Sequence, residues 1–76
     1  MDIKDIITLS DENKYVVASK VHYNNKAWLC LVGIRDNKNI KYCYLDNDEI
    51  VVVKKETIND TLLLKMMNSM LKELKD

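Results

Sequence analysis

Residues 26–35 read Lys-Ala-Trp-Leu-Cys-Leu-Val-Gly-Ile-Arg, and this stretch decides the fold. It is the most apolar part of the chain and contains the only tryptophan, Trp28. Side chains of a strand alternate between the two faces of its sheet, and here both alternating sets are apolar. A strand that is apolar on both sides needs cover on both sides, so we expect 26–35 to lie at the centre of a sheet.

Further segments with strand character flank this central strand and are separated by short polar turns. The turn at 11–13 predicts a three-residue hairpin loop with Asn13 in the left-handed conformation, which places Leu9 opposite Tyr15. Asn-Asn at 24–25 and Asn-Asp at 47–48 predict two-residue turns. The predicted strands span residues 5–10, 14–23, 26–35, 40–46 and 49–55.

Residues 58–74 have a different period, because their apolar residues recur at spacings of three and four, as in an amphipathic helix. Thr57, with Asp60 three residues later, resembles a capping box, and Asn59 is an alternative N-cap. The chain therefore predicts one α+β domain over residues 1–76. In it, a five-stranded antiparallel meander sheet carries one C-terminal helix packed on one face.

The predicted registers divide the strand side chains between two faces of the sheet. We assign the helix to the face that carries Trp28, Cys30 and Cys43, because burying that apolar set gives the largest stabilisation. In the same register, Tyr42 lies opposite Gly33. The helix-covered face also collects Ile7, Leu9, Tyr15, Val17, Val21, Val32, Ile34, Leu45, Ile50 and Val52.

The second face is left open and supplies the main functional hypothesis. It is apolar in its middle and carries Tyr and Arg side chains, which are enriched at protein interfaces. We therefore expect a small accessory protein that binds another protein or a second copy of itself, and pairing of exposed strand edges is a second route to a homodimer. An ordinary half-solvated sheet surface is the alternative. The expected binding residues are Leu29, Leu31, Tyr42, Tyr44 and Val51.

A module that binds single-stranded nucleic acid is the second hypothesis. Tyr42 and Tyr44 share the open face with basic side chains, and aromatic rings among cations can stack bases and hold phosphates. The net charge of zero and the apolar patch on the same face count against this hypothesis. A phage-borne inhibitor of a host protein is a third hypothesis. The residues expected to contact nucleic acid are Lys20, His22, Arg35, Tyr42 and Tyr44.

The sequence presents no residue set for catalysis, a cofactor or a metal. Cys30 and Cys43 are expected to be buried structural thiols on one sheet face, about 7 Å apart and so too distant for a disulfide. His22 points to the opposite face, so these three side chains cannot surround one zinc ion. A nucleophile needs a base and an orienting group, and neither is placed beside one here. We expect a protein without enzymatic activity or cofactors.

Composition and length indicate one folded domain outside the membrane. The 76 residues are 47% hydrophobic and 32% charged, which is typical of a globular chain. The N-terminus begins Met-Asp-Ile-Lys-Asp and lacks the basic and apolar regions of a signal peptide. No stretch approaches the length of a membrane-spanning helix. We therefore expect a cytoplasmic protein whose cysteines stay reduced.

Several of these features resemble a known family. Ile7-Thr8-Leu9, the acidic turn at 11–13, the apolar strand at 28–34 and a strand leading into a C-terminal helix are similar to the YrzB-type family of small, uncharacterised bacterial proteins. The resemblance covers nearly the whole chain. It implies the same fold and a cytoplasmic bacterial origin, and it implies no activity.

Overall fold

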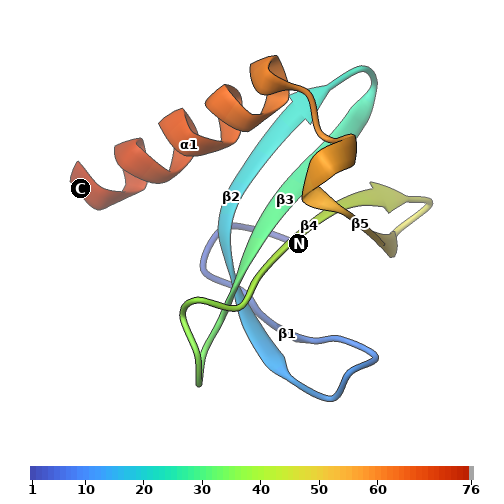
Figure 1. The fold of residues 1–76 in the computed structure, drawn as a ribbon, viewed down its shortest axis with the longest axis vertical. Helices are drawn as coiled ribbons and strands as arrows, with labels where there is room; N and C mark the ends of the chain where they lie inside the picture. The colour runs from blue at the N-terminus through green and yellow to red at the C-terminus, as the bar shows by residue number, and fades with distance from the viewer. Residues whose placement is uncertain (76) are drawn as a thin grey trace.

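The computed structural model describes the backbone of residues 1–75 and the side chains of residues 1–72. Five antiparallel strands follow one another through the sheet in chain order, and a C-terminal helix lies on one face (Figure 1). The predicted α+β class is therefore confirmed. The elements are β1 (Ile6–Thr8), β2 (Lys14–Tyr23), β3 (Lys26–Gly33), β4 (Ile40–Asp46), β5 (Glu49–Val53), the short 3-10 helix η1 (Lys55–Thr57) and α1 (Asp60–Lys75).

Asn and Asp provide the left-handed backbone of the two short hairpin turns. Asn24 and Asn25 have φ values of 51° and 63°, and Asn47 and Asp48 have values of 50° and 69°. Two consecutive residues with positive φ match the right-handed twist of the flanking strands. Both two-residue turns are confirmed.

The connection between β1 and β2 differs from the prediction. Glu12, with φ of 67°, takes the left-handed conformation in place of Asn13. The loop is longer than three residues, because β1 ends at Thr8 and Ile7 lies opposite Tyr15. The pairing register of β1 is thus shifted by two residues, and an even shift keeps the β1 side chains on the predicted face of the sheet.

Asn59 caps α1. Its Oδ1 accepts a hydrogen bond from the Leu62 N–H at 2.8 Å. Its Nδ2 donates to the Tyr23 hydroxyl at 3.1 Å, which joins the start of α1 to the end of β2. The Thr57 hydroxyl instead donates to the Lys54 carbonyl at 2.7 Å, within the turn of η1. The alternative N-cap is therefore confirmed and the capping box is wrong.

A β-bulge interrupts β2. Pairing with β3 starts in the predicted register, with Ser19 opposite Cys30, but beyond the irregularity Val17 lies opposite Leu31. One extra residue in a strand moves the side chains beyond it to the other face of the sheet. Tyr15 and Val17 therefore lie on the side of Leu31 and not on the side of Cys30, as the uninterrupted register predicted.

The register between β3 and β4 is also different. Tyr42 lies opposite Cys30, three places away from its predicted partner Gly33, and an odd shift exchanges the two faces. The physical reason is an early turn after β3. The Gly33 N–H donates to the Asn39 carbonyl at 2.8 Å, and the Asn39 N–H donates to the Asp36 carbonyl at 3.0 Å. Cys43 moves to the face opposite Cys30.

The sheet curls, so that each of its faces has a buried core. We call the cluster of Cys30, Ile58, Leu62 and Met66, which packs between sheet and α1, the helix core. The cluster on the other face, here called the inner core, receives side chains from all five strands. The expectation of one open face is therefore wrong. The inner core consists of Tyr15, Val17, Leu29, Leu31 and Cys43, with Ile7, Leu9, Leu45 and Ile50 packed against them.

Gly33 is required by the close approach of the chain after β3. A Cβ atom at this position would lie 2.6 Å from the Asp36 backbone oxygen, which cannot rotate away as a side chain could. We expect Gly33→Ala to lower the free energy of unfolding by about 1 to 3 kcal/mol through overpacking. Urea denaturation followed by Trp28 fluorescence measures the change. An unchanged denaturation midpoint would show that the loop at 34–39 lies further from Gly33. Asn37→Ala, in the same exposed loop, is the control.

Ser19 places a hydroxyl in the core. Its side chain is 0% exposed, and among residues 1–72 its Oγ is the buried side-chain polar atom that has no hydrogen-bond partner. Burial of an unpaired hydroxyl is unfavourable. We expect Ser19→Ala to raise the free energy of unfolding by about 1 kcal/mol in the same assay. A loss of stability would indicate that the hydroxyl forms a hydrogen bond in the folded protein.

Candidate binding groove at the open edge of β2

The residues predicted to bind a protein do not share one surface. Leu29 and Leu31 are 0% exposed and belong to the inner core. Tyr42 is half-buried against the helix core. Tyr44 and Val51 pair across β4 and β5 and are half-buried on the face that carries α1. The prediction that these five side chains form one open face is wrong, because the register between β3 and β4 exchanges the faces.

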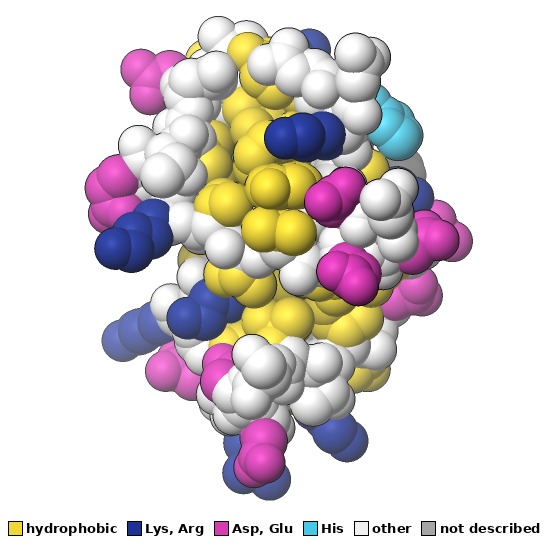
Figure 2. Space-filling model, turned by 90° about the vertical axis from the view of Figure 1, so that its right-hand side faces the viewer, with side chains coloured by type: hydrophobic (Ala, Val, Ile, Leu, Met, Phe, Trp, Pro, Cys, Tyr) yellow, Lys and Arg dark blue, Asp and Glu magenta, His cyan; other side chains and the backbone are white. Residues whose placement is uncertain are grey.

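Tyr44 belongs to an aromatic cluster beside the hairpin of β2 and β3. Its ring lies 5.0 Å from that of Trp28, and the Lys26 Nζ lies 4.4 Å from the centre of the Tyr44 ring. The Trp28 Nε1 donates to the Tyr23 carbonyl at 3.2 Å. Figure 2 shows a band of hydrophobic side chains on the β5 side of the molecule, with charged side chains on both sides of it. The Trp28 N–H and the Lys26 ammonium are thus already engaged within the chain.

The residues predicted to contact nucleic acid are also dispersed. Lys20 and His22 lie two residues apart on β2, near its turn with β3. Arg35 follows β3 at the opposite end of the sheet, where it lines a separate hollow with Lys14 and Asp36. The two tyrosines, Tyr42 and Tyr44, lie on the face that carries α1. Lys20 shares a face with His22, and Tyr42 shares a face with Tyr44, as predicted, but the two pairs lie on opposite faces of the sheet.

A hydrogen-bond network at the Arg35 end joins two loops. The Tyr15 hydroxyl donates to Asp11 Oδ2 at 2.6 Å and accepts from Asn39 Nδ2 at 3.0 Å. The bond from Tyr15, together with a second bond from the Asn13 N–H, lowers the pKa of Asp11. The same bond to Asp11 raises the pKa of Tyr15. These groups bind one another, so the network holds the loops in place.

β2 is paired on both sides over only part of its length. β1 pairs with residues 14–16. The N-terminal segment extends this edge by one residue, because the Lys4 N–H donates to the Val17 carbonyl at 2.8 Å and the Val17 N–H donates to the Asp5 carbonyl at 2.9 Å. In the part of the chain that the structure describes, residues 18–23 pair with β3 alone. The second half of β2 is therefore an open strand edge.

The turn determines which backbone groups face this edge. Tyr23 and Lys26 flank the two-residue turn. The residues on either side of such a turn exchange backbone hydrogen bonds with each other. Bonded and non-bonded pairs alternate along an antiparallel ladder, so Val21 directs its N–H and C=O toward β3, while Lys20 and His22 direct theirs away. Within the described residues, no backbone bond to these outward groups is present. Four backbone groups are therefore free to bond an added strand.

α1 overhangs the open edge. It lies chiefly over β2, and its C-terminal half projects beyond that strand (Figure 1). Between them is a hollow of about 390 Å³. The strand contributes Lys20, Val21 and His22 to it. The helix contributes Lys65, Asn68, Ser69 and Lys72. We call this hollow the β2 groove.

The β2 groove is basic. Lys20, Lys65 and Lys72 line it, and none of its described lining side chains is a carboxylate. The ion pair that Lys20 makes is with Asp2, at 3.5 Å, outside the lining. Sequence reasoning missed the contribution of α1, although Lys65, Asn68, Ser69 and Lys72 lie along one polar flank of the amphipathic helix. Periodicity could have identified this flank, but not the strand beside it.

The two cysteines are buried, as predicted, but on opposite faces of the sheet. Cys30 belongs to the helix core and Cys43 to the inner core. Burial raises the pKa of Cys30 to about 11 and that of Cys43 to about 12, so both stay protonated at neutral pH. Over residues 1–72, no group of His, Cys, Asp and Glu side chains could hold a metal ion. No helix within residues 1–75 is long and apolar enough to cross a membrane.

Comparison of the chain with protein-family models, with curated proteins and with solved structures finds no match. The resemblance to the YrzB-type family therefore stays a prediction.

Proposed function

We propose that this chain is a cytoplasmic, non-catalytic protein-binding module that takes up an extended segment of another protein as an additional strand beside β2. The observation that carries the proposal is the open edge, where the N–H and C=O groups of Lys20 and His22 face the β2 groove. An unpaired strand edge binds extended peptides through main-chain hydrogen bonds. The neighbouring side chains then supply specificity.

The position of α1 supports strand addition. A strand added to a sheet lies about 4.8 Å from its neighbour, which places it beneath the part of α1 that projects beyond β2. Ser69 and Met70 lie on this part of the helix, and Met70 is half-buried because it packs against the helix core. A methionine side chain adapts its shape to different apolar partners. The helix is thus long enough to cover one more strand than the sheet contains.

Charge favours a different protein over a second copy of this chain. Two copies that paired through β2 would bring Lys20, Lys65 and Lys72 of one copy against the same lysines of the other. Like charges at close range oppose association, and lysine is a common means of protecting strand edges from self-pairing. A homodimer through β2 is therefore the less favoured form of the proposal.

The groove offers little to single-stranded nucleic acid. Its described lining contains no Phe, Tyr or Trp, and His22 is the one ring there on which a base could stack. The backbone groups of the open edge match those of a peptide strand. A phage-borne inhibitor of a host protein is one kind of protein that would act through such a contact.

Proline at His22 tests the proposal. Proline lacks the N–H that an added strand would bind, and an edge position with an outward N–H tolerates it. The probe is a blocked nine-residue peptide of alternating Gln and Val. In two-dimensional amide NMR spectra it should shift the Lys20 and His22 resonances of the unmodified protein, and His22→Pro should reduce its affinity at least about tenfold.

The matched control is Val52→Pro. Val52 is exposed on β5 at the opposite edge of the sheet, and the alternation from the 47–48 turn directs its N–H outward as well. This variant should bind the peptide as the unmodified protein does. Equal loss of binding in both variants, or shifts confined to β5, would contradict strand addition at β2.

A further inference from the structure

We infer that the partner segment taken up in the β2 groove is acidic, a conclusion that rests on the proposed function and specifies its ligand. The whole chain has no net charge, with 12 basic and 12 acidic residues. In the groove, however, Lys20, Lys65 and Lys72 gather without a carboxylate among the described lining side chains. Charge complementarity selects a negatively charged segment.

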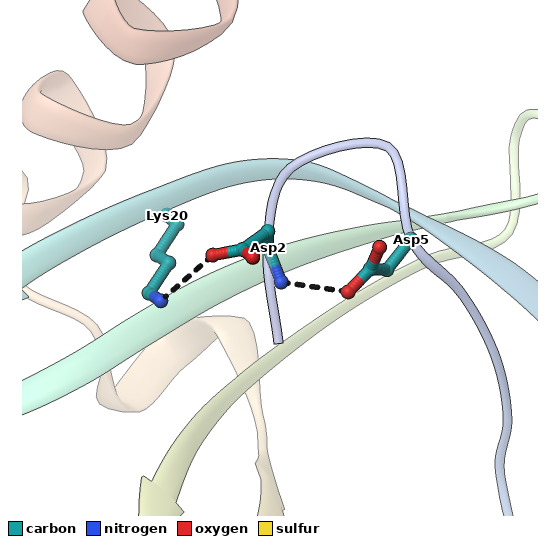
Figure 3. A network of polar contacts seen from close by, with 3 residues as sticks. All are labelled: Asp2, Asp5 and Lys20. Atoms are coloured by element: carbon teal, nitrogen blue, oxygen red, sulfur yellow. Dashed lines mark hydrogen bonds and ion pairs between the residues drawn. The ribbon is translucent and has the colours of Figure 1, made fainter.

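The chain itself holds an acidic segment against this edge. Residues 1–5 extend the edge pairing as far as Val17, which is where the open part begins. From this segment, the Asp2 Oδ1 lies 3.5 Å from the Lys20 Nζ, and the Asp2 N–H donates to Asp5 Oδ2 at 2.8 Å (Figure 3). Asp2 lies in a turn closed by the bond from the Asp5 N–H to the Asp2 carbonyl, and from this turn beside β2 its carboxylate already reaches the first lysine of the groove.

The Asp2 contact leaves room for a partner. The Asp2 side chain is 84% exposed, and a surface ion pair of this kind is weak, so a carboxylate from a partner can replace it. Lys65 and Lys72, which are exposed on α1, form no ion pair within the described residues. An acidic strand would continue the ladder from Val17 over Lys20 and His22, with a carboxylate beside Lys20 and with Lys65 and Lys72 near enough to attract it.

The partner strand has a definite pattern of side chains. Lys20 and His22 lie opposite Leu29 and Ala27, so their side chains point to the sheet face away from α1. A strand of alternating Glu and Val can place its valines under α1 and its carboxylates beside Lys20. The flanking Lys65 and Lys72 add attraction at longer range, which is screened by salt.

The test compares three blocked nine-residue peptides in which Val alternates with Glu, Gln or Lys. Affinity is measured by titration of the Lys20 and His22 amide resonances of the full chain. The Glu peptide should bind about tenfold more tightly than the Gln peptide, and the Lys peptide should bind most weakly. The ratio of Glu-peptide to Gln-peptide affinity should fall toward one as the ionic strength is raised from about 0.05 M to about 0.5 M.

The variant Lys20→Gln/Lys65→Gln/Lys72→Gln, which removes the contacting charge and the two longer-range charges, should bring the ratio of Glu-peptide to Gln-peptide affinity close to one. Lys54→Gln/Lys55→Gln, which changes two exposed lysines outside the groove, should leave the preference intact. Circular dichroism melting verifies that each variant is folded.

The remaining outcomes distinguish this inference from the function on which it rests. Equal affinity for the Glu and Gln peptides would overturn the acidic specificity and leave strand addition standing. No shift at Lys20 and His22 with any peptide would overturn both. A twelve-nucleotide thymidine oligomer that bound more tightly than the Glu peptide, and competed with it, would show that the groove selects nucleic acid and not a protein strand.

Discussion

The β-bulge between Val17 and Ser19 is the constraint on which the rest of the structure depends. An uninterrupted β2 would present the same alternating set of side chains to each face along its whole length. With one extra residue, Tyr15 and Val17 enter the inner core, while Val21 and Tyr23 pack against the helix core. A single strand thus joins the two cores, and the sheet can curl around one of them while α1 covers the other.

The same irregularity separates the protected part of β2 from its open part. A bulge bends a strand and increases its local twist. The backbone bonds from β1 and the N-terminal segment end at Val17, immediately before the bulge. Lys20 and His22 lie beyond the bend, with β3 on one side and no neighbouring strand on the other within the described residues. The change from one core to the other and the start of the open edge therefore fall at the same place in β2.

Local features of the chain were predictable from the sequence. The apolar 26–35 segment, the Asn turns and the change of period at 58 each depend on residues close in sequence, and they yield five strands in order and one helix. The bulge was not predictable, because nothing in the run of β2 marks one residue as extra. The register after Gly33 depends on backbone bonds among Gly33, Asp36 and Asn39, which a turn pattern does not specify.

The missed bulge and the wrong register between β3 and β4 explain why the residues of the predicted site do not form one surface. Each shifts a strand by an odd number of places, so Leu29 and Leu31 became core residues while Tyr44 and Val51 moved to the α1 side. Lys20 and His22 were identified as basic neighbours because they lie on one strand. Lys65 and Lys72 could not be added from the sequence, since the placement of α1 over the edge of β2 is a tertiary contact.

Amide hydrogen exchange, resolved by residue in the free protein, tests the open edge most directly. If this edge is open, the amides of Lys20 and His22 exchange within about tenfold of the rate of an unstructured chain, while those of Val21 and Tyr23, bonded to β3, are protected by several orders of magnitude. Strong protection of all four amides would contradict an open edge, because the second half of β2 would then already be paired.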